Sequence, residues 1–236
     1  MRGPRVPDDI TADMLDKGTL LELRTLPEGL AEMVARHLVA AERALVDGDL
    51  EKAQAYVAVA RDRAGRVAAV REASAIVAYQ AGDFATALAE LRTVRRMSGS
   101  NQYAPMIADC ERGLGRPKKA LDFLKAIELK GLDSETKVEV LLVMSGARAD
   151  LGQLEAAVIT LQVPELTRLK PGTPRARLQY AFSEALERVG RLDEAREWME
   201  RAAGSDLDGA TDAVDRCAEF EGLSFSEVGS DDPDSD

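Results

Sequence analysis

The side chains best suited to chemistry are few in this 236-residue chain and do not form a catalytic set. It has one histidine, His37, and two cysteines, Cys110 and Cys217, which are far apart and in no metal-binding spacing. Asp109 and Glu111 are two residues apart on an expected helix, so their carboxylates face different ways and cannot work as an acid–base pair. We therefore predict a protein that is not an enzyme and has no catalytic residues, metal ligands or cofactor.

Arginines in the middle of the chain could bind an anion. Residues 61–119 carry 11 Lys/Arg against 6 Asp/Glu, and Arg92, Arg95 and Arg96 share one expected helix. Guanidinium groups at this spacing suit an acidic or phosphorylated peptide, or nucleic acid. The alternative is that these arginines form a solvated outer face. The whole chain has a net charge of −11, and residues 205–236 carry 11 acidic residues against one Arg. This acidity disfavours binding of nucleic acid.

A repeated pattern predicts the elements that position these side chains. Five times a glycine is followed five residues later by an alanine, and the glycines recur at near-constant intervals. A small residue seven positions before each glycine and a larger apolar residue nine positions after it also recur. A period of about 34 residues indicates helical hairpins stacked side by side, in which the glycine ends the first helix with a positive φ. The glycines are Gly48, Gly82, Gly115, Gly152 and Gly190, and the alanines are Ala53, Ala87, Ala120, Ala157 and Ala195.

The segments Gly82–Leu88 and Gly190–Arg196 resemble the tetratricopeptide repeat (TPR) family, and the likeness covers roughly residues 31–207. It implies an all-α, right-handed superhelix of about five helix–turn–helix repeats that binds proteins or peptides. The chain departs from the family where tryptophan, tyrosine and a closing proline are usual. The stretch from Val70 to Pro117 also resembles small uncharacterised TPR proteins of high-GC, actinobacterial-type bacteria, a likeness that implies no known activity.

The expected organisation has three parts: an N-terminal arm with a short capping helix at 1–27, the repeats at 28–221, and a disordered acidic tail at 222–236. Residues 1–9 are expected to be disordered, and the helical stretch 10–26 to be interrupted at Gly18. A last capping helix is expected within 206–220, with Ala213, Val214, Cys217 and Phe220 facing inward. The predicted helix pairs are 28–47 with 50–64, 67–81 with 84–97, 102–114 with 117–130, 134–151 with 154–163, and 174–189 with 192–203.

Two charged residues are expected in unusual places. Arg71 and Glu111 occupy positions between helices that are usually apolar. Because buried charges persist only when paired, we expect Arg71 to contact Glu111 or Asp109. The contact would either fix the packing of two repeats or line a ligand site. Glu111→Ala should then leave Arg71 without its partner.

The first helices of such repeats line a concave groove, which is the expected place for a peptide or helix to dock. The groove should be polar and contain two tyrosines, without the run of Lys, Arg and Asn that holds a terminal carboxylate. The residues expected to face it are Glu72, Ile76, Tyr79, Gln80, Gln102, Asp109, Arg112, Tyr180 and Glu184.

Composition fits this interpretation. Only 4% of residues are aromatic, so the core must be built from Ala, Leu and Val, which favours closely packed helices. The longest apolar run, Val140–Met144, is too short to span a membrane, and the first residues lack the apolar core of a signal peptide. We expect a cytoplasmic scaffold that binds a protein or peptide. The alternative is a regulatory protein that binds nucleic acid or another polyanion, and a homodimer through the end caps stays open.

Overall fold

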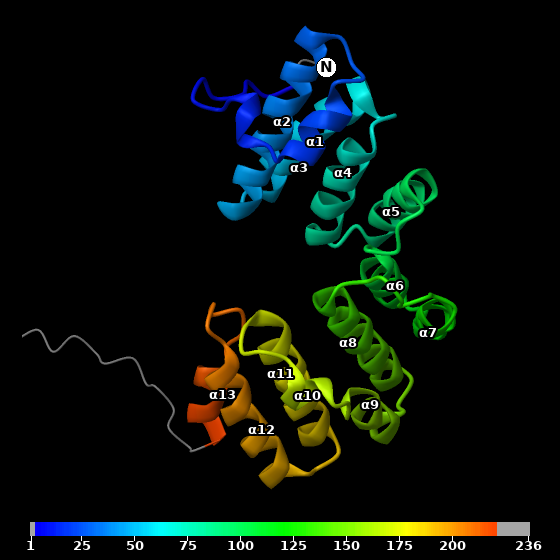
Figure 1. The fold of residues 1–236 in the computed structure, drawn as a ribbon, viewed down its shortest axis with the longest axis vertical. Helices are drawn as coiled ribbons and strands as arrows, with labels where there is room; N and C mark the ends of the chain where they lie inside the picture. The colour runs from blue at the N-terminus through cyan, green and yellow to red at the C-terminus, as the bar shows by residue number, and fades with distance from the viewer. Residues whose placement is uncertain (1–2, 221–236) are drawn as a thin grey trace, which may run out of the picture. The chain divides into compact units, whose positions relative to one another are not determined.

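The computed structural model describes residues 3–220, and the regular elements in this range are all helical (Figure 1), as predicted. Consecutive helices pair into hairpins whose bounds lie close to the predicted ones. The pairs are α2 (Glu28–Val46) with α3 (Leu50–Ala64), α4 (Ala68–Gln80) with α5 (Phe84–Ser98), α6 (Ala104–Gly113) with α7 (Pro117–Lys125), α8 (Ser134–Asp150) with α9 (Leu154–Leu161), and α11 (Thr173–Arg188) with α12 (Leu192–Ser205).

Each hairpin turns at its repeat glycine. The five glycines have φ between 72° and 79°, a left-handed conformation that a side chain would strain. At the next position, Asp49 and Asp83 accept hydrogen bonds from the backbone N–H of Lys52 and Thr86, both at 3.0 Å. The prediction that glycine ends each first helix is therefore confirmed, and in these two hairpins an aspartate starts the second.

Small residues let the paired helices approach closely. The alanine five positions after each glycine is buried in every hairpin. In the last two hairpins the residue opposite is a serine, and its hydroxyl bonds to that alanine's carbonyl. Ser145 Oγ donates to Ala157 O at 3.1 Å, and Ser183 Oγ donates to Ala195 O at 2.5 Å. The recurring small residues thus mark the line of contact within each hairpin.

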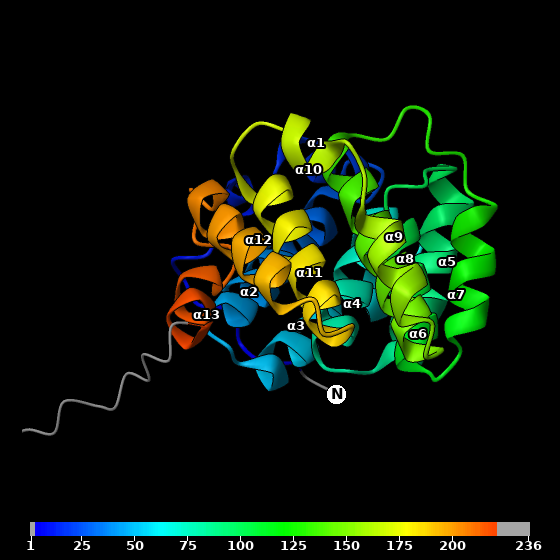
Figure 2. The same ribbon diagram turned by 90° about the horizontal axis from the view of Figure 1, so that it is seen from below.

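The chain divides into two compact units, residues 1–132 and 133–236. Unit 1 contains the first three hairpins and unit 2 the last two, and each has a core of its own. In unit 2, α11 and α12 lie side by side (Figures 1 and 2). The rings of Phe182 and Trp198 pack edge to face between them, with their centroids 5.2 Å apart. A short helix, α10 (Glu165–Arg168), follows Pro164.

The expectation that residues 1–9 are disordered is wrong for residues 3–9. Residues 3–10, here called the strap, lie on the outer side of α2 and α3. Val6 and Ile10 are buried there, and Arg36 Nε donates to the carbonyl of Ile10 at 2.8 Å. Two prolines and an aspartate pair obscured this packing in the sequence, because the partners lie on helices much later in the chain.

Both capping segments differ in detail from the expectation. Gly18 does not interrupt a helix, because α1 (Lys17–Leu23) begins just before it and Asp16 accepts from its backbone N–H at 2.8 Å. The last helix is α13 (Ala213–Phe220). Its Ala213 is buried as expected, but Val214 is 69% exposed, because it lies on the outer face of α13. The predicted acidic tail lies outside the described residues.

Candidate functional site

One face of α4 and one face of α6 carry most of the side chains expected to line a groove. Glu72, Ile76 and Tyr79 follow each other along α4 at intervals that keep them on one side of a helix. Asp109 and Arg112 lie on α6, and all five side chains are partly buried. The structure therefore brings these residues together within unit 1.

Two tyrosine–carboxylate contacts connect α4 to α6. Near the end of both helices, the Tyr79 hydroxyl donates to Asp109 Oδ2, and Arg112 Nη1 donates to Asp109 Oδ1 at 2.7 Å. At the start of both helices, the Tyr103 hydroxyl lies close enough to the Glu72 carboxylate to interact with it. Tyr103 is a finding of the structure. The only sequence signal for it was an aromatic residue directly before a helix.

Burial and hydrogen bonding set the charge states of this cluster. Burial, and then the bond to Asp109, raises the pKa of Tyr79, and burial with the bond to Glu72 does the same for Tyr103. Both phenols therefore stay protonated donors at neutral pH. Burial also raises the pKa of the Glu72 carboxyl, and the nearby acids Glu22 and Asp16 add to this effect.

The N-terminal helix helps to place this surface. Glu22, on α1, accepts a hydrogen bond from the backbone N–H of Ala69 at 2.9 Å, in the first turn of α4. A carboxylate at a helix N-terminus satisfies an otherwise unpaired donor and interacts well with the helix dipole. The first turn of α4 is thus fixed by a residue from far earlier in the chain.

The remaining residues of the expected groove lie elsewhere. Gln80 and Gln102 are exposed, at the end of α4 and just before α6. Tyr180 and Glu184 belong to unit 2, on α11. There Tyr180 lies close to Asp212 and packs against the cluster that includes Ala213, so its neighbours come from the C-terminal segment. Burial raises the pKa of Glu184 as it does that of Glu72.

The central arginines are largely engaged within the chain. Arg92 forms an ion pair with Glu111 at 2.6 Å. Arg95 donates to Asn101 at 3.0 Å and lies over the ring of Phe123 at 5.3 Å. Arg96 is exposed. Of the three arginines expected to bind an anion, two therefore already have partners.

The predicted pairing of Arg71 with Glu111 or Asp109 is wrong. Arg71 pairs with Glu90 of α5 at 2.6 Å, and Arg61 of α3 reaches the same carboxylate at 2.5 Å. Glu111 instead pairs with Arg92 and with Arg116, both at 2.6 Å. Arg71 pairs with Glu90 rather than with Glu111 or Asp109 because α5, which carries Glu90, is the hairpin partner of α4. The signal for this contact in the sequence is a glutamate within the buried stripe of α5.

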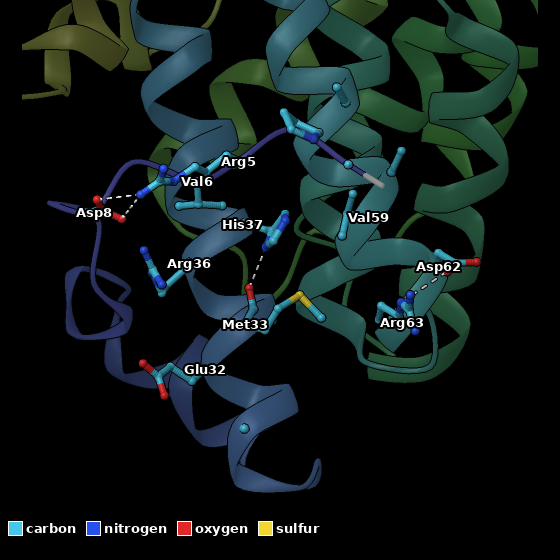
Figure 3. A pocket seen from close by; sticks show the side chains of 15 residues that line it. Arg5, Val6, Asp8, Glu32, Met33, Arg36, His37, Val59, Asp62 and Arg63 are labelled. Carbon is cyan, nitrogen blue, oxygen red and sulfur yellow. Dashed lines mark hydrogen bonds and ion pairs between the residues drawn. The ribbon is translucent and has the colours of Figure 1, made fainter. Parts of the chain in front are cut away.

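A second concave region lies at the outer side of the first hairpin (Figure 3). This end groove, an open cavity of about 1210 Å³, is bounded by the strap, α2 and α3. His37 lies in it, with Nδ1 at 2.8 Å from the carbonyl of Met33 and its ring edge-on to Tyr56. These contacts give His37 a packing role in the first hairpin.

Other reactive groups give no second site. Cys110 is buried, and burial raises the pKa of its thiol to about 12, so the thiolate is scarce at neutral pH. Within residues 3–220, no group of three or more His, Cys, Asp and Glu side chains is arranged to hold a metal ion. No helix in the same range is long and apolar enough to cross a bilayer.

Comparison with known proteins identifies the fold. No family model matches the chain, and no curated protein matches its sequence. Solved structures do match. A thermophilic TPR protein of Thermus thermophilus aligns with a TM-score of 0.61 at 19% identity, over 80% of this chain and 100% of that one.

A second match is a Podosopora anserina protein, named as a putative kinesin light chain, with nearly identical TPR-like repeats. It aligns with a TM-score of 0.55 at 18% identity, over 71% of this chain and 92% of that one. Together with the five glycine-turned hairpins, these likenesses establish that the chain has the all-helical fold of TPR proteins.

Proposed function

We infer that the protein is a non-catalytic interaction module, and that it binds a protein or peptide segment on the surface formed by α4 and α6. This α4–α6 surface consists of Glu72, Ile76, Tyr79, Tyr103, Asp109 and Arg112. The observation that carries the proposal is the pair of tyrosine–carboxylate contacts, one near each end of the two helices.

These contacts preorganise polar groups that remain accessible. All six side chains are only partly buried, so a partner can reach them without unfolding the surface. A group that is already held in place loses little freedom when it binds, which favours affinity. Ile76 of α4 and Met106 of α6 lie within the same stretches of helix and supply partly buried apolar area.

The charge of the surface favours a basic partner. Glu72 and Asp109 are two carboxylates of this surface, and the negative charges of Glu22 and Asp16 lie near enough to raise the pKa of Glu72. The one cation of the surface, Arg112, forms an ion pair with Asp109. A segment that carries lysine or arginine beside an aliphatic residue therefore suits it best. The polyanion alternative gains less support, since Arg92 and Arg95 are engaged.

The test is selection from a library of short peptides, followed by affinity measurement with two variants. Selected peptides should combine a basic and an aliphatic residue. Glu72→Gln and Asp109→Asn together should weaken their binding about ten-fold, the size expected for losing a charge-assisted hydrogen bond. Glu184→Gln is the matched control, because Glu184 is also a half-buried carboxyl with a raised pKa, but in unit 2.

Stability separates a binding role from a structural one. The raised pKa of Glu72 means that the folded state holds its proton more tightly, so the wild type loses stability as pH rises through the folded-state pKa. Glu72→Gln should therefore not lower the melting temperature at pH 7. Selected peptides without basic residues, or equal affinity in the double variant, would contradict the proposal.

A further inference from the structure

The strap is an extended segment bound to a helical surface. It runs along the outer side of α2 and α3 without forming regular structure. Val6 and Ile10, four residues apart, are 9% and 1% exposed and pack with Val39 and Tyr56. The segment therefore contributes to the core through two aliphatic side chains.

The polar contacts of the strap are made mostly to its backbone. Arg36 donates from Nε to Ile10 O at 2.8 Å and from Nη2 to Pro7 O at 3.1 Å. Tyr56 Oη donates to Arg5 O at 3.2 Å. An ion pair also joins Arg43 of α2 to Asp9 at 2.6 Å. Donors aimed at carbonyls, with pockets for selected side chains, are the usual means of holding an extended peptide.

The strap leaves part of this face uncovered. The end groove beside it is lined by Glu32, Met33 and His37 of α2 and by Ala58, Val59 and Arg63 of α3. Figure 3 shows Met33, His37 and Val59 bordering the space below Val6 and Arg5. A second segment could thus contact apolar side chains here before the strap is released.

The charged contact of the strap is weak. The side chains of Arg43 and Asp9 are 42% and 66% exposed, and such exposure makes an ion pair weak and sensitive to salt. Releasing the strap exposes two aliphatic side chains and breaks a few hydrogen bonds, whereas the contacts between α2 and α3 are made by the two helices themselves. We therefore expect the hairpin to stay folded when the strap is released.

We propose that the outer face of α2 and α3 is a second peptide-binding site, and that the strap is its built-in occupant. The occupant from outside is an extended segment of a partner protein with the same chemistry: two aliphatic residues four apart, and a carboxylate before the second. Such a segment enters through the end groove and replaces the strap. This site is separate from the α4–α6 surface and does not depend on it.

The test uses a labelled peptide of residues 3–12 as the probe and fluorescence anisotropy of the full chain. In the wild type the attached strap competes at a high effective concentration, so the probe should bind weakly. In the variant Val6→Asp with Ile10→Asp the strap no longer fits, and the probe should bind at least about ten-fold more tightly.

The control variant is Ile159→Asp with Val214→Asp, which introduces the same charges at a matched pair of side chains that are 67% and 69% exposed in unit 2. It should bind the probe as weakly as the wild type. Adding Arg36→Ala to the strap variant should weaken binding of the probe again, because Arg36 donates hydrogen bonds to two backbone carbonyls of the strap. A probe with its two aliphatic residues replaced by aspartate should not bind.

The result that overturns the proposal is a folded strap variant that binds the probe no more tightly than the wild type, or that binds the substituted probe equally well. Circular dichroism and a cooperative melt verify folding. If the aspartate variant does not fold, Val6→Ala with Ile10→Ala replaces it. This variant should also bind the probe more tightly than the wild type and the control variant do.

Discussion

At the scale of single residues, unit 1 contains two buried carboxylates with two arginines each. Glu90 is 2% exposed between Arg61 and Arg71, and Glu111 is 4% exposed between Arg92 and Arg116. Removing a carboxylate from such a group leaves cations that have lost their partner, and the penalty depends on how easily they reach water. The two sites differ in this respect.

We predict that Glu90→Ala destabilises the protein more than Glu111→Ala. The side chain of Arg71 is only 27% exposed, whereas those of Arg92 and Arg116 are 60% and 38% exposed and can turn into solvent. The loss for Glu90→Ala should be about 3 kcal/mol, near the lower end for breaking a buried pair.

Urea unfolding followed by circular dichroism measures both variants. Glu194→Ala, at an exposed pair with Arg191, is the control and should change stability little. Equal losses for Glu90→Ala and Glu111→Ala would contradict the argument from arginine exposure.

At the scale of elements, the residue after each repeat glycine decides how the second helix begins. Asp49 and Asp83 cap their helices with side-chain hydrogen bonds. Gln153 occupies the same position before α9, with φ −89° and ψ 58°, close to the −79° and 69° of Asp83, but its side chain makes no capping bond. This helix therefore begins with a donor left to solvent.

Gln153→Asp should stabilise unit 2 by about 1 kcal/mol, because aspartate at this backbone conformation can accept from the N–H of Ala156. Thermal melting measures the change. The same substitution at the equivalent position of the third hairpin, Arg116→Asp, should destabilise, since Arg116 pairs with Glu111. An unchanged melting temperature for Gln153→Asp would show that the position needs no cap.

At the scale of the whole molecule, the chain holds two compact units with separate cores. The division falls after Leu132, between the third and fourth hairpins. Each unit contains complete hairpins, so its small-residue contacts and glycine turns are all internal. Repeat proteins gain stability from such hairpins and their nearest neighbours.

Fragments 1–132 and 133–236 should each fold, with helical circular dichroism and a cooperative melt of their own. A division at Gly82, which separates α4 from α5, provides the control and should yield at least one unfolded piece. Loss of helical signal in the fragment 133–236 would show that unit 2 depends on unit 1.

The sequence predicted what is local and missed what is distant. The glycine turns and the helix pairs follow from a pattern that is complete within one hairpin, and both are present. The contact of Tyr103 with Glu72 joins two repeats, and neither residue follows the repeat pattern. The strap pairs residues 3–10 with side chains much later in the chain, and its prolines and aspartates resemble those of a disordered segment.

Charged residues at apolar repeat positions show the same limit. The pattern correctly marked Arg71 and Glu111 as unusual, because each stands where a helix pair needs an apolar residue. It could not choose their partners, since several carboxylates and guanidinium groups lie within reach of a long arginine side chain. Only the three-dimensional packing of α3, α4 and α5 selects Glu90.

The strap also bears on how copies of the chain could stack end to end. A stack of similar hairpins has no natural first member, so its outermost face can accept a hairpin from another copy, and repetition of that contact would produce an open-ended fibre. Residues 3–10 cover part of the outer side of α2 and α3 with an extended segment that is not itself a helical hairpin. We therefore expect a few extended residues at this end of the chain to disfavour end-to-end association of copies.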